Sequence, residues 1–114
     1  MNSLIPRVSY VLTSYNFSET ITKSLSCIFK DAGESCELIY SDDCSSDGTY
    51  ERAISYLAEH KETKFLEISV NRNKRNVGAS GNIAQAISMA QGEYIRIVAG
   101  DDFIKPGSLS LIHI

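Results

Sequence analysis

The chain has 114 residues, enough for one domain with a single hydrophobic core but few for an α/β enzyme. Hydrophobic residues make up 43% and charged residues 22%, which is typical of a soluble globular protein, and the net charge of −3 argues against general nucleic-acid binding. The odd number of cysteines and the lack of a CxxC pair argue against a disulfide framework or zinc site. The chain has three cysteines, Cys27, Cys36 and Cys44, and these thiols fit a reducing compartment.

The sequence contains no recognisable targeting or membrane segment. Pro6 and Arg7 interrupt the start, and strand-like sequence begins at Val8, so no signal peptide is expected. No apolar run approaches the roughly 20 residues that span a bilayer. We therefore expect a cytoplasmic location, which includes the inner face of the membrane.

The first elements alternate between strand and helix patterns. Residues 8–12 read as a strand, and Ser18 is a good N-cap for a helix that carries Glu19 in its first turn. Four apolar residues then recur at helical spacing: Ile21, Leu25, Ile28 and Phe29. We place Gly33 beyond the end of this helix.

The middle of the chain repeats this order. Residues 37–41 read as a second strand, and Asp47-Gly48 is a turn signal. We expect Asp47 to serve this turn and the start of the next helix. Thr49 can cap that helix, whose apolar face carries four residues: Ala53, Ile54, Leu57 and Ala58.

The last elements are a third strand at residues 64–69, a polar loop at 70–77, a third helix and a fourth strand at 93–98. Gly92 is the expected C′ residue of the helix. Pro106-Gly107 begins a turn. Four residues mark the apolar face of the third helix: Ile83, Ala84, Ile87 and Ala90.

This alternation predicts an α/β fold with a mainly parallel sheet and right-handed crossovers. The loops after the strands, residues 13–17, 42–48, 70–77 and 99–103, should then meet at the carboxyl edge of the sheet, where ligands bind. This edge would carry two acidic pairs, which suit a cation and a hydroxyl-rich, phosphate-bearing ligand: Asp42-Asp43 and Asp101-Asp102.

The first two loops offer groups for a nucleotide. The first contains no glycine, which argues against a dinucleotide fingerprint, and no Walker A motif occurs. Tyr15 could stack on a base and Thr13 could donate or accept hydrogen bonds, or Tyr15 simply packs within a turn. In the second loop Asp43 could accept hydrogen bonds from a ribose or base, whereas Asp42 could be a solvated turn carboxylate.

The last two loops offer charge. Arg72, Lys74 and Arg75 could neutralise a pyrophosphate, contact an acidic acceptor or a base carbonyl, or belong to a solvated loop. Asn76 and Asn82 could tie this loop to the sheet edge. Adjacent carboxylates repel, and a hard divalent cation bound by Asp101-Asp102 would relieve that cost, although the pair could also cap a turn.

Four motifs in this order and spacing resemble the nucleotide-binding half of a family 2 glycosyltransferase with the GT-A fold: VSYVLTSYN, LIYSDDCSSDGT, NVGASGNIAQAISMAQGEYI and VAGDD. The similarity runs over residues 8–107. It implies a nucleoside-diphosphate-sugar donor, by family expectation a UDP-sugar, and a divalent cation, Mg²⁺ or Mn²⁺. It also implies inverting transfer to a hydroxyl of a sugar or lipid-linked acceptor, in bacterial surface polysaccharide biosynthesis.

The resemblance also implies residue roles. Thr13 and Tyr15 would contact the nucleobase, and Asp43 the base or ribose. Arg72 or Arg75 would reach the base or diphosphate. Asp102 is the expected metal ligand, with Asp101 nearer the ribose and a second candidate ligand.

Two positions depart from the family pattern. Ala99 stands where many members carry the first aspartate of the DxD-type motif, and Gly81 stands where many carry an arginine. No residue matches the family's general base, which lies in the second half of the domain. An inverting displacement needs such a base to accept the acceptor's proton, so we expect it beyond residue 114 and predict no catalytic residue in this chain.

We therefore predict a truncated, Rossmann-like GT-A half domain, with residues 1–108 forming the nucleotide-sugar-binding part. Residues 109–114, LSLIHI, match one reading frame of a transposon-end sequencing adapter, so we expect a non-native tail; the alternative is a genuine helix start. Two other functions stay open. One is a sugar-phosphate nucleotidyltransferase, which usually has a glycine-rich loop after its first strand; the other is a non-catalytic nucleotide-binding module.

Overall fold

Strands and helices alternate along the chain as the sequence predicts. The computed structural model describes residues 6–33, 35–60, 65–100 and 112–113. The elements follow the order β1 (Val8–Ser14), α1 (Ile21–Asp31), β2 (Cys36–Asp42), α2 (Thr49–Glu59), β3 (Glu67–Arg72), α3 (Ala79–Ile87), β4 (Tyr94–Ala99) and β5 (Ile112–His113).

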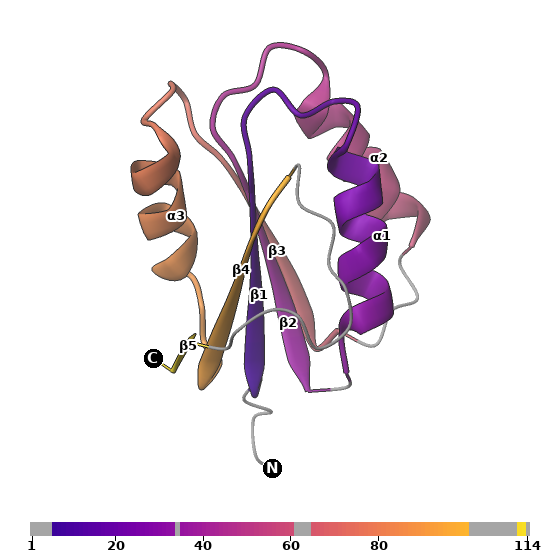
Figure 1. Ribbon diagram of the computed structural model, residues 1–114, viewed down its shortest axis with the longest axis vertical. Helices are drawn as coiled ribbons and strands as arrows, with labels where there is room; N and C mark the ends of the chain where they lie inside the picture. Colours follow the sequence, from indigo (N-terminus) through magenta and orange to yellow (C-terminus); the bar gives the residue numbers. More distant parts are fainter. Residues whose placement is uncertain (1–5, 34, 61–64, 101–111, 114) are drawn as a thin grey trace.

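The strands form a single sheet in the order β3-β2-β1-β4-β5. The pairs β1–β2, β1–β4 and β2–β3 are parallel, and β5 pairs antiparallel with β4. Helices α1 and α2 lie on one side of the sheet and α3 on the other (Figure 1). The α/β class and the mainly parallel sheet are confirmed. Among the described residues, no helix is long and apolar enough to cross a membrane.

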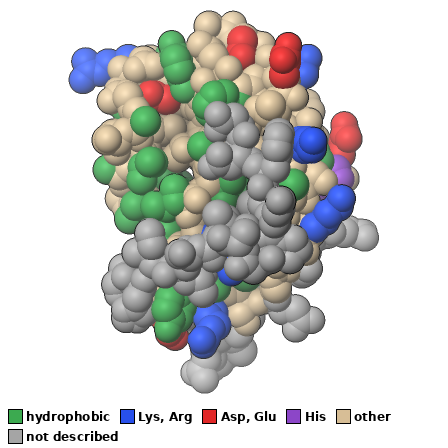
Figure 2. All heavy atoms as spheres, viewed as in Figure 1, with side chains coloured by type: hydrophobic (Ala, Val, Ile, Leu, Met, Phe, Trp, Pro, Cys, Tyr) green, Lys and Arg blue, Asp and Glu red, His purple; other side chains and the backbone are tan. Residues whose placement is uncertain are grey.

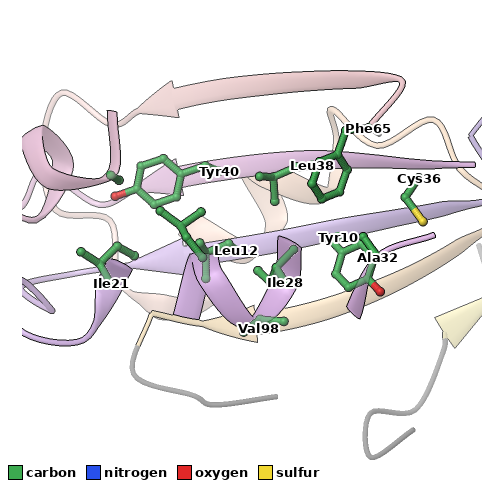
Figure 3. Packing of buried hydrophobic residues seen from close by; sticks show 12 residues of the cluster. Tyr10, Leu12, Ile21, Ile28, Ala32, Cys36, Leu38, Tyr40, Phe65 and Val98 are labelled. Atoms are coloured by element: carbon green, nitrogen blue, oxygen red, sulfur yellow. The ribbon is translucent and has the colours of Figure 1, made fainter. Parts of the chain in front are cut away.

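Each face of the sheet has its own core. Because side chains alternate along a strand, Tyr10 and Leu12 of β1 face α1 and α2, whereas Val11 faces α3. The first cluster is the larger and contains buried residues of β2 and α1 (Figure 3): Leu38, Tyr40, Ile21, Leu25 and Ile28. The second is small, and hydrophobic side chains remain visible on the α3 side of the molecule (Figure 2).

The predicted N-cap of the first helix is wrong. Helix α1 begins at Ile21 with Thr20 as its N-cap. The carbonyl oxygen of Phe17 accepts hydrogen bonds from the Thr20 and Ile21 N–H groups, at 3.1 and 2.9 Å, which makes 17–20 a turn. Ser18 belongs to that turn, and its N–H donates to Asp47 Oδ2 at 3.1 Å.

The third strand begins and ends three residues later than predicted. Phe65 lies before the strand, buried, with edge-to-face contacts to Tyr10 and Phe29. The polar residues Asn71 and Arg72 continue the ladder, because they pair in register with Ser41 and Asp42 at the end of β2.

The third helix ends at Ile87, so Ala90 lies beyond it and Gly92 is not its C′ residue. Gly92 serves a close approach instead. A Cβ atom there would lie 2.6 Å from Ser9 Oγ, and the Gly92 N–H donates to that oxygen at 2.9 Å. The prediction for Gly92 is therefore wrong, and the glycine instead allows the start of β4 to lie against β1.

Candidate nucleotide site

The site lies where the order of the sheet reverses. From β1 the chain adds β2 and β3 on one side, and α3 then returns it to β4 on the other side of β1. Ligands of open α/β sheets bind at such a switch point, beyond the carboxyl ends of the strands. Thr13 of β1 and Ala99 of β4 are register partners there.

A cavity of about 530 Å³ opens at this point. Segments far apart in the sequence line it, including the ends of β1 and β4, the loop after β2 and the first turns of α3. Thr13, Tyr15 and Asp43, all predicted site residues, share its wall. Thr13 is buried, whereas 45% of the Tyr15 surface is exposed, so its ring is free to take part in stacking.

Asp43 is buried, at 2% exposure, and anchors the loop between β3 and α3. Its Oδ1 accepts hydrogen bonds from the Val77 N–H at 2.8 Å and from Asn73 Nδ2 at 3.0 Å. Its Oδ2 accepts one from the Gly78 N–H at 2.9 Å. Gly78 is the N-cap of α3, so the carboxylate also lies where the helix dipole favours negative charge.

Asp42 faces the opposite side of the sheet and is fully buried, which corrects the idea of a solvated turn carboxylate. It accepts hydrogen bonds from Ser14 Oγ at 2.7 Å, the Ser45 N–H at 2.8 Å and Ser45 Oγ at 2.5 Å. The nearby Tyr40 hydroxyl also contacts Ser14 Oγ, at 2.7 Å. Burial raises the pKa of Tyr40 above its usual value, so this hydroxyl stays protonated at neutral pH.

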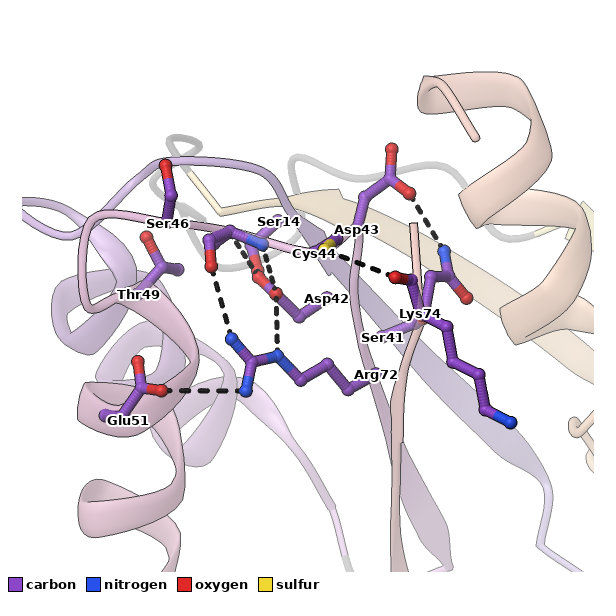
Figure 4. Close-up of polar contacts among 12 residues, drawn as sticks. Ser14, Ser41, Asp42, Asp43, Cys44, Ser46, Thr49, Glu51, Arg72 and Lys74 are labelled. Atoms are coloured by element: carbon purple, nitrogen blue, oxygen red, sulfur yellow. Dashed lines mark hydrogen bonds and ion pairs between the residues drawn. The ribbon is translucent and has the colours of Figure 1, made fainter. Parts of the chain in front are cut away.

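The two predicted arginines lie in different surroundings, and neither lines the cavity. The guanidinium of Arg72 lies 4.6 Å from the centre of the Tyr50 ring and donates to the Ser45 carbonyl at 3.2 Å. It also lies 3.9 Å from Asp42 Oδ2 and 3.6 Å from Glu51 Oε2 (Figure 4). Arg75 is exposed, one residue before the cavity-lining Asn76.

Asp47 serves the turn and helix start, as predicted. It accepts hydrogen bonds from the Thr49 N–H at 3.1 Å and from the Thr49 hydroxyl, and Gly48 takes a φ of 92° between them. Partial burial raises the pKa of Asp47, but the hydrogen bonds from Thr49 and Ser18 outweigh this effect and hold the pKa below its usual value.

Asp101 and Asp102 lie outside the described residues. Gly100, which precedes them, is held by hydrogen bonds. The Gly100 N–H donates to the Thr13 carbonyl at 2.7 Å. Its carbonyl accepts hydrogen bonds from Thr20 Oγ1 at 2.8 Å and Ser24 Oγ at 3.0 Å. Within the described part of the chain, no three His, Cys, Asp or Glu side chains cluster as metal ligands would.

The polar residues behind the cavity pair with one another, and no sequence motif indicates this network. Ser41 and Asn82 are buried and hydrogen-bonded to each other, and Asn71 and Asn73 join them. The expectation that Asn82 ties the loop to the sheet edge is confirmed. The cysteines carry no disulfide.

Comparisons with known proteins show the family of the chain. The profile of the family "Glycosyl transferase family 2" matches residues 9–112. The succinoglycan biosynthesis protein ExoO of Rhizobium meliloti is 28% identical over 105 residues, which cover 92% of this chain and 28% of ExoO.

Solved structures match the fold. The mannosyltransferase PcManGT from Pyrobaculum calidifontis, in complex with GDP-Man and Mn²⁺, superimposes with a TM-score of 0.77 at 23% identity. S. aureus TarS 1–349 in complex with UDP gives 0.73 at 27% identity. Each match covers 87% of this chain and 28% of the other. The chain therefore belongs to glycosyl transferase family 2 and has the fold of its GT-A members.

Proposed function

We propose that this chain carries the donor-binding part of a glycosyltransferase that moves a sugar from a nucleoside diphosphate to an acceptor hydroxyl, with inversion, in polysaccharide biosynthesis. The chain spans 36%, 28% and 22% of the lengths of the first three curated relatives that it matches. The transfer activity is accordingly assigned to a longer parent protein. The acceptor, a sugar or lipid-linked sugar, would bind elsewhere in that parent.

The observation that carries this proposal is the shared cavity at the switch point of the sheet. Tyr15 offers a partly exposed ring for stacking, Thr13 adds polar groups, and Asp43 offers carboxylate oxygens. A uracil or guanine base presents a flat face and N–H donors, which suit these groups. The binding of UDP by TarS, a structural neighbour at 27% identity, supports a UDP-sugar as the donor.

We propose that Asp102, with Asp101, holds a divalent cation at the rim of this cavity. Ala99 lines the cavity and Gly100 is hydrogen-bonded to Thr13, and Asp101 and Asp102 follow directly in the sequence. Carboxylate oxygens suit Mg²⁺ or Mn²⁺, and the structural neighbour PcManGT was solved with Mn²⁺. A bound cation would stabilise negative charge on the departing diphosphate.

The remaining chemistry belongs to other parts of the parent. No residue of this chain matches the family's general base, so we propose that an acidic residue further along the parent accepts the proton of the acceptor hydroxyl. The three cysteines form no disulfide, which fits a reducing compartment, and we propose the cytoplasm or the inner face of its membrane.

The proposal is tested by titrating the chain with UDP in the presence of Mn²⁺ and measuring the heat of binding by calorimetry. The wild-type chain should bind UDP saturably, and Asp43→Asn should weaken binding by about tenfold or more, because hydrogen bonds to a charged group contribute about 1.5–3 kcal/mol. Glu59→Gln, which neutralises an exposed carboxylate at the end of α2, is the matched control and should bind like wild type. Absence of saturable binding of both UDP and GDP would contradict the proposal.

A further inference from the structure

We propose that Asn82 is a positioning residue: it fixes the segment 73–78 and, through that segment, the Asp43 carboxylate in the wall of the cavity. The expected effect of Asn82 on nucleotide binding rests on the proposed function, whereas its effect on the segment 73–78 does not. The inference depends on a network of hydrogen bonds that links Asn82, through Ser41 and Asn73, to the Asp43 carboxylate.

Asn82 joins the end of β2 to the segment 73–78. Its side chain is buried in the first turns of α3, at 2% exposure. The Oδ1 atom accepts hydrogen bonds from Ser41 Oγ at 2.6 Å and from Asn73 Nδ2 at 3.1 Å. The Nδ2 atom donates to the Ser41 carbonyl at 3.0 Å. Only a group that accepts at one atom and donates at the other satisfies all three contacts.

The other members of the network point toward Asp43. Asn71 Nδ2 donates to Ser41 Oγ and to Asn73 Oδ1, both at 2.9 Å. Asn73 Nδ2 then donates to Asp43 Oδ1, at 3.0 Å, as well as to Asn82. Buried networks of this kind act as a unit, so the loss of one member is felt by the others.

The segment in turn sets the surroundings of the Asp43 carboxylate. The Val77 and Gly78 N–H groups reach Asp43 only when residues 73–78 follow their observed course. Gly78 and Asn82 also line the cavity directly, together with Asn76. Asn82 therefore orders both the wall of the cavity and the donors that hold its carboxylate.

The variant Asn82→Asp tests this role because its effect should depend on pH. When ionised, the introduced carboxyl accepts at both oxygens, so one oxygen faces the Ser41 carbonyl and the network breaks. When protonated, it can accept and donate as the amide does. Among the described residues that line the cavity with Asn82, the titratable groups are Asp43 and Tyr15; Ser41, Asn71 and Asn73 of the network are neutral. The Asp43 charge and burial both favour the protonated form, so acidic pH should restore the network.

The experiment compares the complete chain with Asn82→Asp at pH 8 and pH 5.5. Amide hydrogen exchange is followed by NMR, corrected for the intrinsic rates, and UDP affinity is measured at both pH values. At pH 8 the Val77 and Gly78 amides of the variant should exchange at least tenfold faster than in wild type, and UDP should bind at least tenfold more weakly. Both should return to within about threefold of wild type at pH 5.5.

Two controls separate positioning from general damage. The Gly100 amide, which donates to the Thr13 carbonyl, should keep its protection throughout. Gln85→Glu makes the same chemical change at an exposed position of α3 and should leave exchange and affinity unchanged. If Asn82→Asp does not fold at pH 8, Asn73→Ala serves in its place, and it should accelerate exchange at Val77 and Gly78 selectively.

The exchange measurements decide the inference. Unchanged protection of Val77 and Gly78 at pH 8, or equal acceleration of these amides and of Gly100, would overturn it. If the exchange pattern is as expected but the wild-type chain binds no UDP, Asn82 still positions the segment and the proposed function fails.

Discussion

The carbonyl oxygen of Gly100 accepts a hydrogen bond from the hydroxyl of Thr20 at 2.8 Å. This contact explains why Thr20, the N-cap of α1, makes no side-chain cap to its own helix. Ser24, one turn further along, donates to the same carbonyl at 3.0 Å. The first turn of α1 thus fixes the point at which the chain leaves β4, directly before Asp101.

Replacement of Gly100 by alanine should damage this junction. A Cβ atom there would lie 2.8 Å from Phe17 Cδ2 and 3.1 Å from Ile21 Cδ1 and Ser14 Cβ. Such overpacking costs about 1–3 kcal/mol. Urea denaturation of Gly100→Ala should show this loss, and calorimetry should show weaker Mn²⁺-dependent binding of UDP.

Gly33→Ala is the matched control, because no described residue other than its chain neighbours has an atom within 4 Å of a Cβ at that position. Its free energy of unfolding should equal that of wild type or exceed it slightly, since alanine reduces the conformational entropy of the unfolded chain. Equal stability of the two variants would show that the space around Gly100 is wider than the structure gives.

Replacement of Arg72 should reduce the stability of the chain, whereas replacement of Arg75 should reduce its affinity for UDP. Arg72→Ala removes the contacts with Tyr50, Asp42 and the Ser45 carbonyl, so it should lower the free energy of unfolding by about 1–3 kcal/mol. Arg75→Ala removes an exposed cation, so its stability should stay within about 0.5 kcal/mol of wild type while UDP affinity falls. Urea denaturation and UDP titration of both variants check this, and the opposite pattern would assign the ligand contact to Arg72.

Asp47 should contribute a pH-dependent stabilisation to the start of α2. Because hydrogen bonds hold its folded-state pKa below the usual value, this contribution is present above the unfolded-state pKa and is lost as pH falls through the folded-state pKa. Asp47→Ala should be less stable than wild type by about 1 kcal/mol at pH 7, as for loss of a capping acceptor. Urea denaturation at pH 7, 5 and 3 should show this difference shrink at pH 3; a constant difference would contradict the role of the charge.

The sequence predicted the helices, the strands and the carboxyl edge of the sheet well, because hydrophobic periodicity and turn residues indicate where elements begin and end. The chain reversals at Gly33 and Asp47-Gly48 lie at or beside helix ends. The placement of Tyr15 beside Asp43 followed from one general property of parallel sheets, that the ends of their strands meet at one edge.

The errors arose where tertiary contacts override local signals. Ser18 has the better capping side chain, but its N–H is bound by Asp47, 29 positions along the chain. The third strand was placed too early because Phe65 and Leu66 are apolar, whereas the pairing with β2 favours the polar residues that follow. The roles proposed for Arg72, Arg75, Asp101 and Asp102 stay predictions.

The opposite orientation of Asp42 and Asp43 makes the end of β2 intolerant of changes in length. Insertion or deletion of one residue within this strand would exchange the two carboxylates between faces. The apolar side chains before them would change faces too, so Leu38 and Tyr40 would leave the larger core, and the carboxylates would lose the partners that hold them. Variation in this strand should therefore be limited to substitutions, with insertions and deletions displaced into the turn at Ser46.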